Sequence, residues 1–232
     1  MCGRFSNRMS WREIHALYSI HDQENVVPND YEARYNIAPT DRVAACRIAD
    51  GVREIVRLRW GLIPYWAKDA KIGFSTFNAV GETVAEKPMF RDAFKARRCL
   101  IPASGFYEWK KLDPAGKKKQ PYAIVPAKDD DAFSFAGLWE RWKDKTSGET
   151  IESCTIITTT PNEVCAPIHN RMPVILPKET WAHWLGEEPA DRGQLLALLK
   201  PSDAALMRAY PVGAAVGNVK NQGPQLMEPV AA

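Results

Sequence analysis

Short runs in which hydrophobic and polar residues alternate recur along this chain and predict a structure made mainly of strands. Residues 43–48 and 52–60 are two such runs, and Asp50-Gly51 between them is a typical hairpin turn. In the second run three apolar residues alternate with Arg57 and Arg59, which predicts one apolar and one cationic face. These two runs therefore predict a β-hairpin with one face toward a core.

Further short runs rich in β-branched and aromatic residues predict more strands. They are residues 99–103, 106–110, 122–125, 133–139 and 154–159. Residues 74–80 are compatible with an extended segment, and the polar stretch 113–119 predicts a hairpin tip. Residues 22–40 have the character of a loop.

Helical periodicity is confined to short stretches. Ser10-Trp11-Arg12-Glu13 has the pattern of a capping box, and apolar residues follow it at helical spacing. Residues 89–97, 178–185 and 191–199 predict three more short helices. Many strands without β-α-β alternation predict an antiparallel α+β architecture, and the lack of a linker predicts one domain over residues 1–232.

The composition is that of an ordinary globular protein, with 232 residues, 45% hydrophobic content and a net charge of +3. This weak positive charge permits a nucleic-acid partner and does not by itself indicate one. The N-terminus lacks the pattern of a signal peptide, and no apolar stretch reaches the length of a membrane span. We therefore expect a cytoplasmic protein that does not enter a membrane.

Five cysteines, at positions 2, 46, 99, 154 and 165, include no Cys-x-x-Cys pair, so reduced thiols are expected. The cysteines and the four histidines do not fall at metal-ligand spacing, and the sequence has no phosphate-binding glycine loop. The sequence thus predicts neither a metal nor a cofactor.

Cys2 is the most suggestive candidate for chemistry. Removal of Met1 would leave a residue that carries an α-amino group and a thiol on neighbouring carbons. Both groups titrate near pH ~8 to ~8.5 when unperturbed, so each is partly nucleophilic at neutral pH. Such an aminothiol condenses with an aldehyde to an imine and can then close a thiazolidine ring. The alternative is that Cys2 is simply a small buried hydrophobe.

Three later residues are candidates to assist Cys2. Glu108 lies between aromatic residues, where burial would raise its pKa and make it an acid near neutrality, although it could equally face outward from a strand. His169 lies in a loop bounded by prolines, a setting that more often serves function than packing. Asn78 is polar within an apolar neighbourhood and could instead be a structural bridge between backbone groups.

The remaining histidines have less suggestive settings. His15 and His183 are typical of structural or surface positions, and His21 of a loop. Arg171, next to the His169 loop, could clamp an anion or form an ordinary surface ion pair. The loop 61–66 carries aromatic residues that are expected to be exposed, Trp66 among them.

Together these segments resemble the SRAP (SOS response-associated peptidase) family, whose motifs occur here in family order from residue 1 to about 223. The matching segments are Met1-Cys2-Gly3-Arg4-Phe5, Arg34-Tyr35-Asn36-Ile37-Ala38-Pro39, Trp60-Gly61-Leu62-Ile63-Pro64, Asn78-Ala79, Gly105-Phe106-Tyr107-Glu108-Trp109, His169-Asn170-Arg171-Met172-Pro173 and Val216-Gly217-Asn218-Val219-Lys220-Asn221. Several motifs in register are far more specific than any one of them.

The resemblance implies a single α+β domain with a β-rich, barrel-like core flanked by short helices. It also implies a protein that removes its own Met1 and captures abasic sites in single-stranded DNA as a thiazolidine crosslink, with lyase-like activity. We expect a monomer, because one domain can grip both flanks of a lesion. The catalytic residues would be Cys2, Asn78, Glu108 and His169. The DNA-binding residues would be Arg4, Asn36, Trp66 and Arg171.

One position departs from the family pattern. The family usually has Arg two residues after the Asn, where this chain has Val80. If that Arg contacts a phosphate, Val80 should weaken DNA binding and its salt dependence unless other arginines, such as Arg57 and Arg59, compensate.

Two other classes of function remain open on the sequence. A thiol peptidase would use Cys2 with a histidine. A non-catalytic reader of single-stranded or modified DNA would stack bases on Trp66 and its neighbours. A crosslinking enzyme explains best why Cys2, Glu108 and His169 occur together.

Overall fold

Five strands close into a small barrel in the computed structural model, which describes residues 2–20, 31–129 and 131–231. The strands are β3 (Arg42–Ala49), β4 (Val52–Trp60), β6 (Arg98–Ala103), β9 (Phe133–Lys143) and β10 (Thr150–Thr159). The ring closes because β10 pairs with both β4 and β9. The other neighbours in the ring are β4 with β3, β3 with β6 and β6 with β9.

The predicted α+β class and barrel-like core are confirmed, but the core is not wholly antiparallel. The β4–β10 pair is parallel, whereas the other four pairs of the ring are antiparallel. Five strands form an odd ring, in which directions cannot alternate all the way around. One parallel pair is therefore a geometric necessity.

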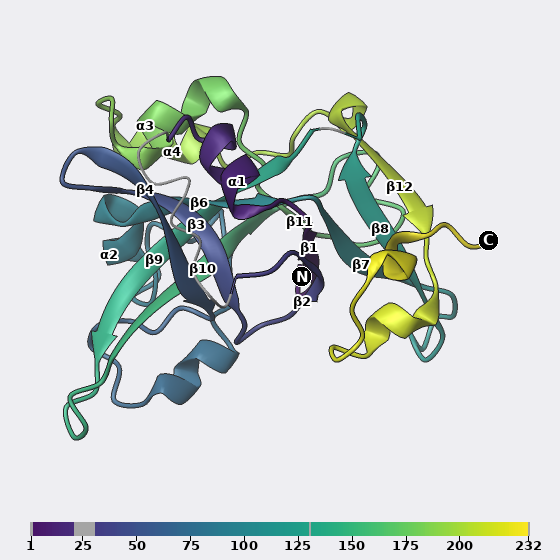
Figure 1. Cartoon of the computed structure of the whole chain (residues 1–232), viewed down its shortest axis with the longest axis horizontal. Coiled ribbons are helices and arrows are strands. Elements are labelled where there is room, and N and C mark those ends of the chain that lie inside the picture. The colour runs from purple at the N-terminus through teal and green to yellow at the C-terminus, as the bar shows by residue number, and fades with distance from the viewer. Residues whose placement is uncertain (1, 21–30, 130, 232) are drawn as a thin grey trace.

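A second sheet lies beside the barrel, on the right in Figure 1, in the order β12-β8-β7-β1-β2. Its strands are β1 (Phe5–Asn7), β2 (Arg34–Ile37), β7 (Gly105–Lys111), β8 (Lys119–Pro126) and β12 (Met207–Pro211), and all pairs are antiparallel. The strands β7 and β8 were predicted. Strand β2 was expected to be loop, and β1 and β12 were not foreseen, because these short strands show no sustained alternation.

Two short strands attach to β10 outside the ring. β5 (Asn78–Val80) pairs with β10 in parallel, and β11 (Met172–Pro173) pairs with it antiparallel. The expectation of an extended segment over 74–80 is right only for its end, since a 3-10 turn, η1 (Ala70–Phe74), occupies its start.

Four short α-helices cover the barrel on the side away from the second sheet (Figure 1). They are α1 (Trp11–Leu17), α2 (Arg91–Ala96), α3 (Trp181–Leu185), which follows the turn η2 (Lys178–Thr180), and α4 (Arg192–Ala197). The predicted capping box is confirmed, because the Ser10 side chain accepts from Glu13 N and the Glu13 carboxylate accepts from Ser10 N. All four predicted helices are present, each shorter than expected.

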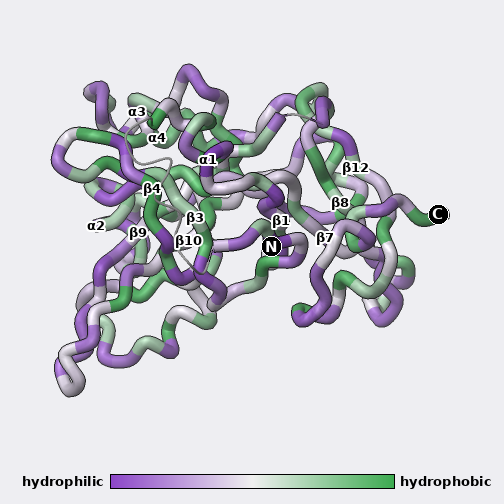
Figure 2. The backbone as a smooth tube through the Cα atoms, viewed as in Figure 1, coloured by the Kyte–Doolittle hydropathy of each residue, from purple (hydrophilic) through white to green (hydrophobic). Residues whose placement is uncertain are grey.

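The hydrophobic core has two main parts, one on each side of the barrel wall. Alternate residues of one strand divide between them: Leu58 and Trp60 of β4 pack inside with Phe5 and Phe106 of the second sheet, whereas Ile55 packs outside against the helices. Figure 2 shows the corresponding hydrophobic stretches along the strands. The chain start is held inside because Phe5 belongs to the inner part.

The end of the described chain folds back over the second sheet in three 3-10 turns. They are η3 (Ala204–Leu206), which precedes β12, and η4 (Ala214–Gly217) and η5 (Pro224–Met227), which follow it. A third cluster that includes Tyr107, Val216 and Leu226 packs beneath η4 and η5. Within the described ranges, no helix is both long and apolar enough to cross a membrane. His21 and residues 22–30 of the predicted 22–40 loop lie outside the described residues.

Candidate active site

The short strand β1 fixes the start of the chain between two longer partners. Phe5 pairs with Ile37 of β2 on one side and with Phe106 of β7 on the other. The Phe5 ring also packs edge-on against Trp60, with centroids 5.2 Å apart. As a result Cys2, just ahead of β1, is fully buried in the inner core cluster.

The thiol of Cys2 is held in its neutral form. Burial raises the pKa of this thiol far above its ordinary value, and the nearby Glu108 carboxylate raises it further. A thiolate at Cys2 is therefore strongly disfavoured at neutral pH. Chemistry that begins with a thiolate fits this environment poorly, whereas chemistry that begins with an amine does not need one.

Asn78 binds the backbone of Cys2 directly. It is the first residue of β5, where pairing with Ile156 of β10 brings it to the inner cluster. Its amide Nδ2 donates to the Cys2 carbonyl oxygen at 2.7 Å. Its Oδ1 is buried and accepts no hydrogen bond within the described ranges, which leaves an acceptor at the site for an incoming donor.

Glu108 points inward from β7 rather than outward, with 5% of its surface exposed. Burial raises the pKa of its carboxyl from an ordinary 4.5 to about 7. A carboxyl that titrates near neutrality can both give and take a proton there, which is the requirement for general acid–base catalysis. The outward-facing alternative does not hold in this structure.

His169 faces Glu108 across the site, with its Nε2 at 3.9 Å from Glu108 Oε2. The backbone N–H of Arg171 donates to His169 Nδ1 at 3.0 Å. Because a backbone N–H can only donate, Nδ1 is the acceptor, and in the neutral ring the proton lies on Nε2. Burial lowers the pKa of His169, so the neutral ring that presents Nε2–H to Glu108 is favoured.

Arg4 lies two residues beyond Cys2 and is held rigidly. Its Nη1 donates to Asn36 Oδ1 at 2.8 Å and to the Val216 carbonyl at 2.6 Å. Its guanidinium carbon also lies 5.6 Å from the centre of the Trp109 ring. Arg4 is half-buried, and its position directly before β1 places a fixed cation beside Cys2.

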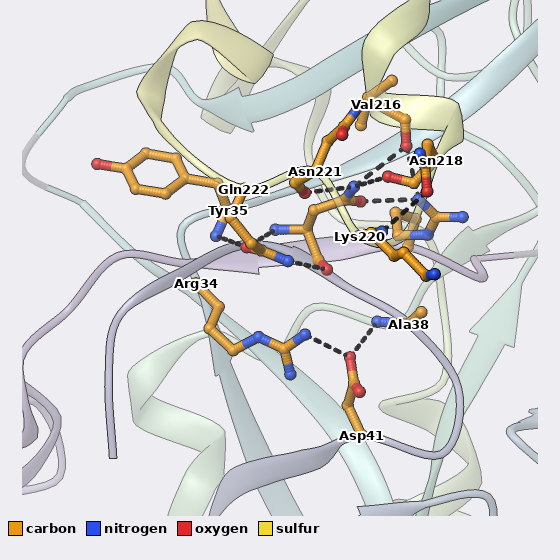
Figure 3. Close-up of polar contacts among 11 residues, drawn as sticks. Arg34, Tyr35, Ala38, Asp41, Val216, Asn218, Lys220, Asn221 and Gln222 are labelled. Atoms are coloured by element: carbon orange, nitrogen blue, oxygen red, sulfur yellow. Dashed lines mark hydrogen bonds and ion pairs between the residues drawn. The ribbon is translucent and has the colours of Figure 1, made fainter. Parts of the chain in front are cut away.

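Asn36 is fully buried and holds Arg4 in place. Arg4, Asn36, Gln222 and the segment 216–221 are called the Arg4 anchor below. Its Nδ2 donates to three carbonyl oxygens of the segment 216–221, at 3.0 to 3.2 Å, while its Oδ1 accepts from Arg4. Gln222 completes the tie, because its side chain bonds the backbone N–H and C=O of Asn36 (Figure 3). Asn36 was expected to bind DNA; in this structure its side chain bonds Arg4 and the segment 216–221, and the DNA contact stays a prediction.

Arg171 is engaged in an ion pair. Its guanidinium donates two bonds to the Glu82 carboxylate, at 2.6 and 2.7 Å, and a third to the Thr158 carbonyl at 2.6 Å. These hydrogen bonds lower the pKa of Glu82. Val80, where the family resemblance led us to expect an Arg, ends β5 two residues before Glu82, the partner of Arg171.

Trp66 lies apart from these residues, in the loop after β4. It is 46% exposed, and its neighbours Tyr65 and Phe74 are also exposed, as expected for the loop.

Of the other histidines, His15 is buried with its Nδ1 at 2.9 Å from the Trp11 carbonyl, and His183 lies beside Glu188 on the surface. These two positions are structural and surface positions, as predicted.

One nearby group was not foreseen from the sequence. Cys165 is buried in the same cluster as Cys2, and burial together with the Glu108 carboxylate raises the pKa of its thiol to about 12. In the sequence, the only sign that Cys165 could belong to the site was that it is a cysteine. Among the described residues no three His, Cys, Asp or Glu side chains gather as metal ligands would.

The structure thus brings Cys2, Asn78, Glu108 and His169 together in one buried site. Comparison with known proteins bears on what the site does. The sequence model of the family described as SOS response associated peptidase (SRAP) matches residues 1–219.

Curated proteins are similar over nearly the whole chain. The abasic site processing protein YoqW of Bacillus subtilis is 44% identical over 98% of this chain and 99% of its own length. YedK of Escherichia coli and HMCES of Xenopus tropicalis, which have the same description, are each 33% identical and are covered over 100% and 78% of their lengths. A crystal structure of a Bacteroides thetaiotaomicron protein superposes with a TM-score of 0.88 at 30% identity, covering 99% of this chain and all of that one.

Proposed function

This chain belongs to the SRAP family, and we propose that it captures abasic sites in single-stranded DNA covalently through Cys2. Its relatives are abasic site processing proteins, so DNA with abasic sites is the substrate class that the comparison supports. The observation that carries the covalent step is the buried contact of Asn78 with the Cys2 carbonyl, beside a carboxyl that titrates near neutrality.

Capture requires that Met1 be removed first. Hydrolysis of the Met1–Cys2 peptide bond consumes one water and frees the α-amino group of Cys2. That amine adds to the aldehyde carbon of the ring-opened sugar and forms a carbinolamine. Loss of water from the carbinolamine leaves an imine, and the neutral Cys2 thiol then adds to the imine carbon while its proton goes to the nitrogen. The net change is one new C–N bond, one new C–S bond and one released water.

Glu108 and His169 supply the proton transfers in this scheme. The protonated Glu108 carboxyl gives its proton to the departing hydroxyl of the carbinolamine, and it can take one back in the reverse reaction. The Nε2–H of His169 is a donor to the sugar ring oxygen, so it favours the open aldehyde form. The free Oδ1 of Asn78 can accept from the new α-ammonium and so orient it.

DNA binding in this proposal uses the cations at the rim of the site. Arg4 is fixed beside Cys2 by Asn36, and Arg171 lies on the opposite side near His169. A phosphate that reaches Arg171 competes with the Glu82 carboxylate for the same guanidinium fork. Trp66, exposed on its loop, offers a ring on which an unpaired base can stack.

The test is a denaturing gel with a single-stranded oligonucleotide that carries one abasic site. Protein whose loss of Met1 is verified by intact mass should give a band shifted by one protein mass. The band should be lost in Cys2→Ala and kept in Cys165→Ala, a matched buried thiol in the same cluster. Fully trimmed protein that gives no shifted band with damaged DNA would refute the proposal.

The Cys2→Ala variant also separates the two alternatives when native DNA binding and peptide cleavage are measured beside the gel. A reader of single-stranded DNA would bind equally well after Cys2→Ala and form nothing that survives denaturation. A general thiol peptidase would cleave unrelated peptides with Cys2, but the strongly raised pKa of this thiol disfavours it. We propose that self-removal of Met1 is the extent of peptidase activity. Light scattering of the native protein tests the proposed monomer, and the free cysteines are in keeping with the proposed cytoplasmic location.

A further inference from the structure

A cavity of about 410 Å³ opens next to the Arg4 anchor, outside the buried site. It lies between β2, β3 and β4 on one side and the segment 219–222 on the other. Four cationic side chains line it, and each comes from a different element: Arg34, Arg42, Arg57 and Lys220. None of them takes part in the chemistry proposed for Cys2.

The lining of this cavity carries more cations than carboxylates, in a protein whose net charge is only +3. Glu32 is the single carboxylate among its lining residues, and Asp41 binds Arg34 at its edge at 2.9 Å (Figure 3). Arg42 and Lys220 are exposed, and neither forms an ion pair within the described ranges. A concave surface that gathers cations from separate elements is suited to an anion with several charges.

The cavity is continuous with the anchor of Arg4. Gln222 lines the cavity and also accepts from the backbone N–H groups of Tyr35 and Asn36. Asn36 in turn holds Arg4. Arg34 and Asn36 belong to the same strand, β2, and lie ~7 Å apart along it, with a β-bulge in the pairing of β2 with β1. Strand β2 thus connects Arg4, which Asn36 holds, with Arg34 in the wall of the cavity.

We propose that this cavity is a phosphate subsite for the DNA strand that flanks the abasic site. A polynucleotide repeats its negative charge at regular intervals, which matches a row of separated cations better than a single anion does. Guanidinium groups bind phosphate oxygens through two N–H donors, so Arg42 and Arg34 supply directional contacts and Lys220 a point charge. The identity of the strand as damaged DNA rests on the proposed function; the binding of a phosphodiester strand does not.

The test measures equilibrium binding without crosslinking. The DNA carries a tetrahydrofuran abasic analogue, which has no aldehyde, and is lengthened one nucleotide at a time on either side of the lesion. The double variant Arg42→Gln/Lys220→Gln is compared with Lys95→Gln/Lys178→Gln, which removes two exposed lysines from α2 and η2. Thermal unfolding verifies that both variants fold.

Wild type should gain affinity when the strand on one side becomes long enough to reach the cavity. In the cavity variant this gain should disappear, and the slope of log K against log salt should fall by about 1.4, which corresponds to two phosphate contacts of a single strand. If wild type and the cavity variant bind equally at about 1 M salt, this difference in slope means that the variant binds about 25-fold more weakly at about 0.1 M salt. The control variant should behave like wild type at every length.

Three results would overturn the proposal. An unchanged slope and length dependence in the cavity variant shows that no strand enters the cavity. Equal losses in the control variant show that only net charge matters. Pyrophosphate is titrated as a second probe. If the cavity variant loses pyrophosphate binding while its DNA binding is unchanged, the cavity binds a free phosphoanion. Crosslinking to a true abasic site is measured in parallel, so failure of the covalent chemistry is seen separately from failure of the subsite.

Discussion

Replacement of Glu108 by Gln should remove a loss of folding stability with rising pH that arises because the Glu108 carboxyl is buried. The pKa of the Glu108 carboxyl rises from 4.5 to about 7 in the folded chain, where the residue is 5% exposed. Below pH 4.5 the carboxyl is protonated in both states. Between pH 4.5 and 7 the unfolded chain releases this proton while the folded chain still holds it, so the folded state loses stability as pH rises.

The size of this loss follows from the two pKa values. Each pKa unit is 1.36 kcal/mol, so a rise from 4.5 to about 7 amounts to about 3 kcal/mol of stability that is absent above pH 7. Gln has a similar shape and does not ionise. The variant should therefore become more stable relative to wild type by about 3 kcal/mol between pH 4 and pH 8.

Urea unfolding at pH 4, 5, 6, 7 and 8 measures the free energy of unfolding of both proteins. The prediction concerns how the difference between the two free energies changes with pH. Glu152→Gln is the matched control with the opposite sign. Burial raises the pKa of Glu152, but hydrogen bonds from Arg141 and Arg47 outweigh it and lower that pKa. This control should lose stability relative to wild type as pH rises through the range between its lowered folded pKa and 4.5, at the acid end of the series, and the difference should stay constant from pH 6 to 8.

The Glu108 variant also links stability to catalysis. If Glu108 donates the proton that expels water from the carbinolamine, capture by wild type should slow as pH rises through about 7. Glu108→Gln should be slower by about 10²- to 10⁴-fold and should lack that pH dependence. A stability difference between Glu108→Gln and wild type that stays constant from pH 4 to 8 would refute the reasoning about burial.

Three further predictions concern the surroundings of Cys2. Asn78→Ala removes the 2.7 Å bond to the Cys2 carbonyl, so crosslinking in single-turnover gels should slow by a factor that corresponds to about 1–2 kcal/mol, with DNA affinity unchanged. Glu82→Gln removes a carboxylate that competes for Arg171, so DNA binding measured by fluorescence anisotropy should tighten by about 0.2–1 kcal/mol at low salt. Val80→Arg should restore a cation and steepen the salt slope by about 0.7; an unchanged slope argues against a phosphate at this position.

The sequence predicted those parts of the fold that depend on neighbours along the chain. The hairpin of β3 and β4 follows from alternation around Asp50-Gly51, and both turn residues adopt the positive φ angles that such a turn requires. Closure of the barrel could not be predicted in the same way. It depends on β10 pairing with β4 and β9, and pairing between distant strands leaves no local pattern.

In the candidate site too, some features could be predicted from the sequence and others depend on tertiary structure. The inward position of Glu108 was one of two possibilities that alternation allowed, and only packing of the second sheet on the barrel decided between them. Asn36 was selected through the family resemblance, but its four hydrogen bonds to residues 4 and 216–221 arise from tertiary structure. Residue type indicates which groups can react; only the fold shows which polar groups are already used.

The anchor of Arg4 has a consequence for how this protein is made. Arg4 and Val216, which it binds, are 212 residues apart in the sequence, so at ordinary rates of translation roughly 10–40 s separate their synthesis. During that interval the newborn N-terminus has neither β7 beside it nor the segment 216–222 above it. If Cys2 acts as proposed and methionine is trimmed early, its aminothiol is open during this interval to small aldehydes in the cell. Synthesis of residues 216–222 is then the event that allows the nucleophile to be enclosed.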